Sequence, residues 1–326
     1  MKAGIAFLSL VLLSLFAARA MAWDSVGHRV SAAVAYEYLS AETRDSLLEI
    51  LRAHPRFRQD FEAEIPAFID RDNEAEFQTW LLGQAAYWPD IARGLPEGER
   101  ESYNRPVWHY TDGAWVRGAA TRQGNIYVGI PPFPAIAGTP ATEISNEQDA
   151  SNVVTALDWN SHVLASTDFS MAQRAVALCW VLHLVGDIHQ PLHTGSAYSP
   201  DLFSGGDQGG NRIATDAGNF HARWDGAVSN NGIVENTRQI LTRLSSTQAP
   251  VESDWTQWLG ESREILQNFA YSDEIRAAIA QADATGRALQ PITLDAGYVN
   301  QMRQLGQQRI GLAGLRLASW LESALD

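Results

Sequence analysis

The 326 residues include 38 Asp and Glu against 24 Lys and Arg, which gives a formal net charge of −14. Such an acidic chain is a poor candidate for coating nucleic acid with a broad basic surface, because that mode of binding needs many Lys and Arg side chains. The single cysteine, Cys179, excludes an intrachain disulfide and is expected to be a buried packing residue. An anionic substrate would need locally concentrated positive charge, of which a bound metal is the densest source.

Residues 1–22 have the form of a secretory signal peptide. One lysine precedes an apolar run over 5–16, and Ala20-Met21-Ala22 supplies the small residues of a cleavage site. The run is too short to cross a bilayer, so we expect no membrane anchor. We expect cleavage after Ala22, a mature chain that begins at Trp23, and a secreted or periplasmic location.

Helical spacing dominates the remaining sequence, so we predict a mainly α, single compact domain over 23–326 with little β structure. The first helix is predicted over 23–39, with Asp24 or Ser25 as its cap. Two irregular stretches rich in glycine and proline are predicted over 123–142 and 194–219. Further helices are predicted over 40–53, 59–70, 75–86, 147–165, 170–190, 221–229, 234–245, 254–268, 272–284 and 295–324.

The most informative stretch reads CWVLHLVGDIHQPLHTG, residues 179–195. His183 and Asp187 are four residues apart and therefore share one face of a helix. Pro191 should end that helix, which lets His193 reach a neighbouring position. An imidazole and a carboxylate inside an otherwise apolar helix are costly unless a partner satisfies them, and a metal ion would satisfy both.

A second pair with the same spacing is His221 and Asp225 in HARWD. Two such pairs and a histidine after a proline favour a zinc site with more than one ion, since imidazole and carboxylate suit zinc. Asp90 in YWPDIARG and His109 in VWHYTDG are further candidates, both flanked by aromatic residues. One pair alone is most often an ordinary hydrogen-bonded pair, so the metal interpretation depends on the repetition.

The other histidines lack such a setting. His189 is rotated away from the face that carries His183, and it is a weaker candidate ligand. His54 and His162 have no partner at helical spacing, so we interpret them as ordinary surface or core residues. The glycines over 205–210 do not form a phosphate-binding P-loop, because no lysine follows them.

The series of motifs resembles the S1/P1 nucleases, zinc-dependent single-strand nucleases of fungi and plants that also have bacterial members, and we expect a bacterial member here. The distance from Trp23 to Asp90 is longer than in the fungal enzymes, so an insertion is expected within 50–80. In the family's order, the matching motifs are WDSVGH at 23–28, WPD at 88–90, HY at 109–110, HLVGDIHQPLH at 183–193, GGN at 209–211 and NFHARWD at 219–225.

The resemblance implies three zinc ions. In this family the first mature residue is itself a ligand, through its free amino group and carbonyl oxygen, so removal of the signal peptide would complete the site at Trp23. The resemblance assigns Asp90, His109, His183 and Asp187 to one ion, Trp23, His28 and Asp187 to its close neighbour, and His193, His221 and Asp225 to the third.

The resemblance also implies a reaction, the hydrolysis of phosphodiester bonds in single-stranded DNA and RNA to 5′-phosphorylated products. A 3′-nucleotidase activity is a further expectation, and the protein is expected to act as a monomer. Single strands are favoured because an unpaired base leaves its stack at least cost. The implied catalytic residues are the ligands Asp90, His109, His183 and Asp187.

The same resemblance assigns three residues to the substrate. Tyr110 would stack on a nucleobase, Asp112 would accept a hydrogen bond from its edge, and Asn211 would contact the substrate. Because the mature chain contains no lysine, any cation extended toward phosphate must be an arginine, and Arg93 and Arg212 are the candidates.

Two alternatives remain open. A zinc-dependent phospholipase C shares the expected fold and the N-terminal tryptophan, but it has glutamate where HARWD ends in Asp225, and its first histidine follows the terminus after a longer gap than that of His28. A non-catalytic exported protein that stores or senses zinc would bind metal without hydrolysing any substrate. It would have no need for an aromatic side chain and a carboxylate beside an open metal position.

Overall fold

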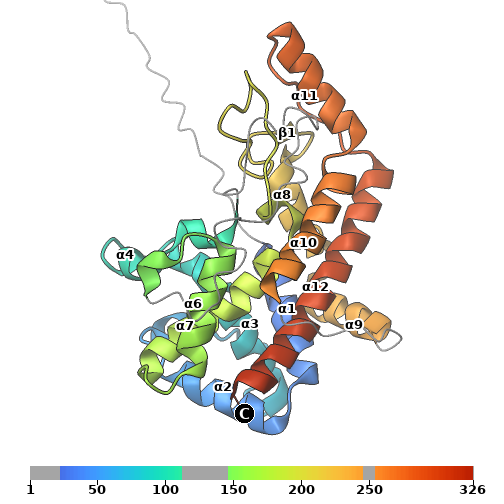
Figure 1. Cartoon of the computed structure of the whole chain (residues 1–326). Coiled ribbons are helices and arrows are strands. Elements are labelled where there is room, and N and C mark those ends of the chain that lie inside the picture. The colour runs from blue at the N-terminus through green and yellow to red at the C-terminus, as the bar shows by residue number, and fades with distance from the viewer. Residues whose placement is uncertain (1–22, 112–145, 245–253, 326) are drawn as a thin grey trace, which may run out of the picture.

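The computed structural model describes residues 23–111, 146–244 and 254–325. The expected signal peptide, Asp112 and the irregular stretch 123–142 lie outside these residues. Helices make up most of the described chain (Figure 1), and its strands are the two-residue β1 (Ala214–Thr215) and β2 (Gly218–Asn219), which pair antiparallel. The prediction of a mainly α fold is confirmed.

Polar caps begin many of the helices, as the sequence predicts. The side chain of Asp24 accepts hydrogen bonds from the backbone at the start of α1, and Ser170 does the same for α7. The helices are α1 (Ser25–Tyr38), α2 (Ala41–Arg52), α3 (Glu74–Ala92), α4 (Glu99–Tyr103), α6 (Val153–Ala165), α7 (Met171–Ile188), α8 (Phe220–Asp225), α9 (Gly232–Leu244), α10 (Trp255–Ile265), α11 (Asp273–Thr285) and α12 (Ala296–Leu325).

α7 lies at the centre of the main hydrophobic core. It packs against α3 and α6, while α1 packs against α3 and the long α12 (Figure 1). α7 is apolar and long enough to span a membrane by composition, yet 72% of that span is buried inside the protein. Its apolar surface is therefore covered by the other helices, and Cys179 is fully buried there, as expected.

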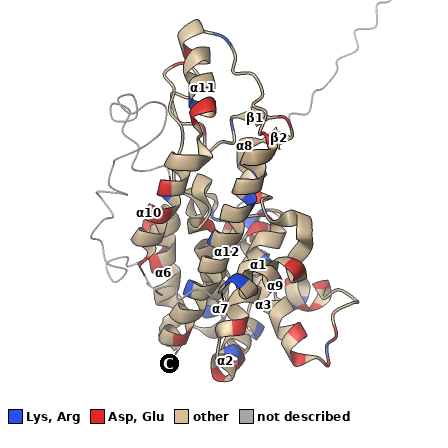
Figure 2. Ribbon diagram, turned by 90° about the vertical axis from the view of Figure 1, so that its right-hand side faces the viewer, with Lys and Arg blue, Asp and Glu red and all other residues tan. Residues whose placement is uncertain are grey.

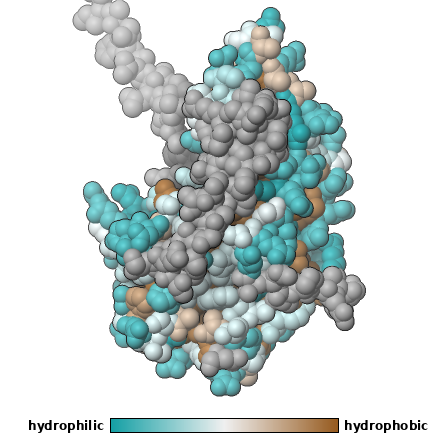
Figure 3. Space-filling model, in the orientation of Figure 1, coloured by the Kyte–Doolittle hydropathy of each residue, from teal (hydrophilic) through white to brown (hydrophobic). Residues whose placement is uncertain are grey.

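A second hydrophobic cluster lies around Trp23, Phe220 and Trp224, where α8 meets the residues after α10 and the first half of α12. Trp23 is fully buried in it. Acidic and basic residues are interspersed along the helices (Figure 2), and the described part of the face in Figure 3 is mostly hydrophilic. Burial of Trp23 in a core cluster fixes the position of its backbone.

The predicted helix over 59–70 is wrong. The structure has one π-helical turn at Phe57–Phe61 and a 3₁₀ turn at Glu62–Glu64, followed by non-helical chain. Pro66 explains the break, because proline disfavours the helical conformation of the residue before it and donates no hydrogen bond. The π-helical turn is held against α3 by Asp60, whose side chain accepts a 2.8 Å hydrogen bond from Trp88 Nε1.

Other elements also differ from prediction: the helix predicted over 147–165 begins at Val153, and the helix predicted over 221–229 ends at Asp225. α3 continues past the predicted residue 86 to Ala92 with Pro89 inside it, and α4 was not predicted. His54 is buried against Trp88, and burial lowers its pKa to about 3, whereas His162 is exposed. Neither histidine lies among the predicted ligands, in agreement with their interpretation as ordinary residues.

Candidate metal centre

The eight predicted histidine and aspartate ligands come together in the interior. None is more than 8% exposed. They come from six elements: His28 from α1, Asp90 from α3, His109 from the 3₁₀ turn Pro106–His109, His183 and Asp187 from α7, His193 from the 3₁₀ turn Pro191–His193, and His221 and Asp225 from α8.

Asp187 lies between two groups of ligands. Its Oδ2 is 3.0 Å from His109 Nδ1 and 3.3 Å from His183 Nε2. Its Oδ1 is 3.4 Å from His28 Nε2. A carboxylate whose two oxygens face different imidazoles has the arrangement needed to bridge two neighbouring cations.

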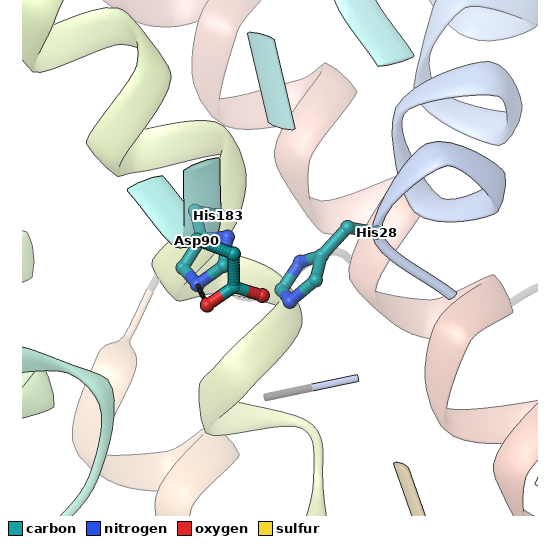
Figure 4. Close-up of side chains that lie close together, drawn as sticks. All are labelled: His28, Asp90 and His183. Atoms are coloured by element: carbon teal, nitrogen blue, oxygen red, sulfur yellow. Dashed lines mark ion pairs between the residues drawn. The ribbon is translucent and has the colours of Figure 1, made fainter. Parts of the chain in front are cut away.

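Asp90 completes the group around His183. Figure 4 shows its carboxylate facing the rings of His28 and His183, and Asp90 Oδ1 is 4.0 Å from His183 Nε2. The two rings stack with centroids 3.8 Å apart and an angle of 14° between their planes. Asp90, His28 and His183 thus offer one ligand atom each, all within 4.8 Å of one another.

A separate group consists of His193, His221 and Asp225. The two Nε2 atoms are 3.1 Å apart, and they lie 3.9 Å and 3.5 Å from the oxygens of Asp225. Pro191 does end the regular helix, since α7 stops at Ile188 and His193 follows in a 3₁₀ turn. The break lets His193 turn toward α8, as the sequence predicts.

The outer nitrogens of three histidines are held by backbone carbonyls. His183 Nδ1 donates to Ala86 O at 2.7 Å, His193 Nδ1 to His109 O at 2.5 Å, and His221 Nδ1 to Gly209 O at 2.7 Å. A carbonyl oxygen only accepts, so Nδ1 carries the proton and Nε2 turns its lone pair inward. This is the way in which metal-binding histidines are commonly oriented.

Several buried polar atoms of these side chains lack hydrogen bonds. Among the described residues, both ring nitrogens of His28, Nε2 of His109 and Oδ1 of Asp187 are buried without a hydrogen-bond partner. A buried polar atom without a partner is destabilising by about 1–3 kcal/mol. Imidazole and carboxylate are the donors that bind zinc, so a divalent cation fits this set of residues.

The pKa shifts of these side chains follow from their burial and from their contacts with one another. Burial lowers the pKa of His28 and His109, so both rings are neutral and can act as ligands. Burial raises the pKa of Asp90 and Asp225, because a carboxylate charge is unfavourable away from water. Burial also opposes the charge of Asp187, but His183 and His109 outweigh it and lower that pKa.

Trp23 is held beside the ligands from two directions. Its indole Nε1 donates to Gly186 O at 2.9 Å, and the next residue, Asp24, donates its backbone N–H to Asp225 O at 3.2 Å. Gly186 is required for close packing here, because a Cβ at this position would lie 2.9 Å from His28 Nδ1. The backbone of residues 23–24 therefore lies between α7 and α8, the two helices that each carry a histidine and an aspartate of the set.

Two neighbours of the ligands in the HQPLH motif have other roles. His189 donates from Nδ1 to Val185 O and its Nε2 faces Arg316 Nη1 at 2.9 Å, so it is outside the ligand set, as expected. Gln190 is fully buried and its Nε2 donates to Asp225 Oδ1 at 2.7 Å. Sequence reasoning missed Gln190, and its only signal was a polar residue in a buried motif.

A cavity of about 730 Å³ opens onto both groups. Tyr110 lines it and is 38% exposed, and the predicted substrate residue Asn211 lines it as well. Arg93 also lines the cavity, with its Nη2 2.9 Å from Asp90 Oδ1. Arg212 is not among the lining residues, and its guanidinium donates to the carbonyls of Leu202 and Gly206.

The GGN motif forms the turn that orients His221. Gly209 has a φ of +59°, and a Cβ there would lie 2.2 Å from Leu192 O and 3.3 Å from His221 Nδ1. Gly218 has a similar φ of +86°, but nothing lies within 4 Å of a Cβ placed on it. Substitutions at Gly209 and Gly218 would therefore introduce the same backbone strain, but only the substitution at Gly209 would also cause a close contact.

We predict that Gly209→Ala lowers the free energy of unfolding by at least about 3 kcal/mol, because strain and a backbone clash add together. Gly218→Ala should lower it by only about 1 kcal/mol, since it introduces strain alone. Urea unfolding of both variants measures the difference. Equal losses would contradict the role given to the Gly209 turn.

Comparisons with known proteins place the chain in a family. The family model described as S1/P1 Nuclease matches residues 23–326. Nuclease S1 of Aspergillus oryzae is 21% identical over 311 residues, which cover 92% of this chain and 91% of that protein.

Two plant proteins match a shorter stretch. Endonuclease 4 and Endonuclease 5 of Arabidopsis thaliana are 29% and 26% identical over 156 residues, 44% of this chain, and the match spans about half (49%) of the length of each. The family model nevertheless covers the chain from Trp23 to its last residue, including every side chain of the centre described above. The chain belongs to the S1/P1 nuclease family.

Proposed function

We propose that the protein is an exported, zinc-dependent nuclease that hydrolyses phosphodiester bonds of single-stranded DNA and RNA and leaves 5′-phosphorylated products. Membership of the S1/P1 nuclease family supports a nuclease. The observation that carries the proposal is the convergence of eight buried imidazole and carboxylate side chains, several with unpaired atoms, beside a cavity that three of the histidines line. Action as a monomer, and on 3′-nucleotides as well, belongs to the same proposal.

Three zinc ions are proposed, held as the family resemblance implies. Asp187 would be shared between two of them, in keeping with the opposite directions of its two oxygens. The third would lie among His193, His221 and Asp225. Bound zinc supplies Lewis-acid stabilisation of phosphate charge and lowers the pKa of water toward neutrality.

The chain's own residues would bind and orient the substrate. Tyr110 offers a half-exposed aromatic face on which an unpaired base can stack. Asn211 offers an amide on the cavity wall, although its Nδ2 already donates to Gln208 O at 2.8 Å. Arg93, between Asp90 and the cavity, would place a guanidinium beside a phosphate at the metal centre.

A substrate panel tests the proposed function. Protein that begins at Trp23 and is loaded with zinc should hydrolyse single-stranded DNA and RNA faster than duplex DNA, and should lose activity in a chelator. Mass spectrometry should find the phosphate on the 5′ end of the products. Hydrolysis of phosphatidylcholine instead would indicate a phospholipase, and bound zinc without hydrolysis of any substrate would indicate a storage or sensing protein.

Asp187→Asn tests the shared ligand. The amide keeps the size of the side chain but weakens both of its contacts, so zinc content should fall from three ions per chain to one. Inductively coupled plasma mass spectrometry measures the content, and Asp225→Asn is the matched control that should lose only one ion. Equal losses from the two variants would argue against a bridging Asp187.

An added residue tests the role of the amino terminus. A chain with one methionine before Trp23 has no free amino group at that position, so it should lose at least about 100-fold in activity on single-stranded DNA, as expected for a disrupted metal site. Circular dichroism should show an unchanged helical content. Full activity with the extra methionine would overturn the proposed terminal ligand.

A further inference from the structure

The cavity of the metal centre extends well beyond the ligands. Its 730 Å³ lies in the upper half of the range of about 300–1,000 Å³ that is usual for ligand sites. Its wall includes His109, His193 and His221, and it also includes Arg100 of α4 and Asn104, which follows the end of that helix. A substrate that fills the cavity therefore reaches residues that take no part in holding metal.

This wall has an unusual charge for so acidic a protein. The chain carries a formal charge of −14, yet no Asp or Glu is among the described residues that line the cavity. Its lining includes two arginines, Arg93 and Arg100. Arg93 is already 2.9 Å from the carboxylate of Asp90, so Arg100 is the cation with capacity for a further anion.

Two of the neighbouring carboxylates are bound by other arginines. Glu99 pairs with Arg56 at 2.6 Å, and Glu147 pairs with Arg105 at 2.5 Å. Within the described part of the chain, the guanidinium of Arg100 has neither a hydrogen bond nor an ion pair. A half-buried arginine without a carboxylate partner, on a wall without acidic side chains, is suited to bind an anion.

Phosphate is the anion that matches this position. The guanidinium fork binds phosphate oxygens in a bidentate manner, and a nucleic-acid strand carries one phosphate on every nucleotide. Arg100 lies on α4, a short helix at the edge of the molecule (Figure 1), whereas the candidate ligands are buried and come from other elements. A strand whose scissile phosphodiester lies at the metal centre could therefore place a second phosphate at Arg100.

We propose that Arg100 binds a phosphate other than the one being cleaved, and so favours oligonucleotides over dinucleotides. The inference rests on the proposed nuclease function and names a specificity residue for it. The scissile phosphate and its chemistry remain with the metal centre, and Arg100 contributes to the binding of the strand.

Steady-state kinetics with two substrates test this proposal. Arg100→Gln should lower kcat/KM on a ten-residue oligothymidylate about 10-fold, mainly through KM, and should change kcat/KM by less than 2-fold on a thymidine dinucleotide, which has a single phosphodiester. Arg238→Gln is the matched control, since it removes the same charge from exposed α9 and should change neither value. An equal effect of Arg100→Gln on both substrates, or none on either, would overturn the proposal.

Binding without turnover gives a second readout. With metal removed by a chelator, fluorescence anisotropy of a labelled oligothymidylate should show weaker binding to Arg100→Gln, and the slope of log K against log salt should be shallower by about 0.7, the value for one phosphate contact on a single strand. Arg100→Lys should restore the slope. Identical slopes for Arg100→Gln and wild type would refute the contact.

The two hypotheses fail in different ways. If the zinc-loaded wild type hydrolyses neither substrate, the proposed nuclease function is wrong, while the anisotropy measurement still decides whether Arg100 binds a strand. If the wild type is active and Arg100→Gln matches it in kinetics and salt dependence, the function stands and the role of Arg100 is wrong.

Discussion

The structure depends on a group of imidazoles and carboxylates that face one another in the protein interior. Removing such groups from water costs free energy, and the cost is larger when their inward atoms make no hydrogen bonds. His28 and Asp187 are both fully buried, and neither ring nitrogen of His28 nor Oδ1 of Asp187 has a hydrogen-bond partner among the described residues. Imidazole and carboxylate donors in this arrangement suit a divalent cation, which is why we place the proposed function of the chain there.

Much of the fold can be understood as support for these side chains. α7 carries two of them through the apolar core and ends where Pro191 redirects the chain toward α8. Backbone carbonyls from α3, from the 3₁₀ turn Pro106–His109 and from Gly209 hold the outer nitrogens of three histidines. Gly186 and Gly209 occur where a side chain would collide with a ligand or its support. The glycine motifs are therefore part of the metal centre although they contribute no donor atom.

The sequence alone predicted the helical class, and the ligand candidates that it named lie close together in the structure. Spacing was sufficient for His183 and Asp187, because four residues along a helix determine a shared face. It was insufficient for Asp90 and His109, which meet α7 through tertiary packing. Their aromatic setting made them candidates, and only the resemblance to a family assigned them to an ion.

Other features of the structure could not be predicted from the local sequence. The helix predicted over 59–70 failed because the turn-forming effect of Pro66 outweighed the periodic pattern. The hydrogen bond of Gln190 to Asp225 and the position of Arg100 on the cavity wall depend on distant segments. Periodicity reports which face of an element is buried, but it cannot report which partner that face meets.

The central claim is that these side chains surround divalent cations. A crystal structure of protein that begins at Trp23, with anomalous diffraction measured at the zinc edge, tests it most directly. Our account predicts three anomalous peaks: one bounded by Asp90, His109 and His183, one beside His28 and the amino terminus, and one among His193, His221 and Asp225. Correctly folded, zinc-soaked crystals with no peak among these side chains would contradict it.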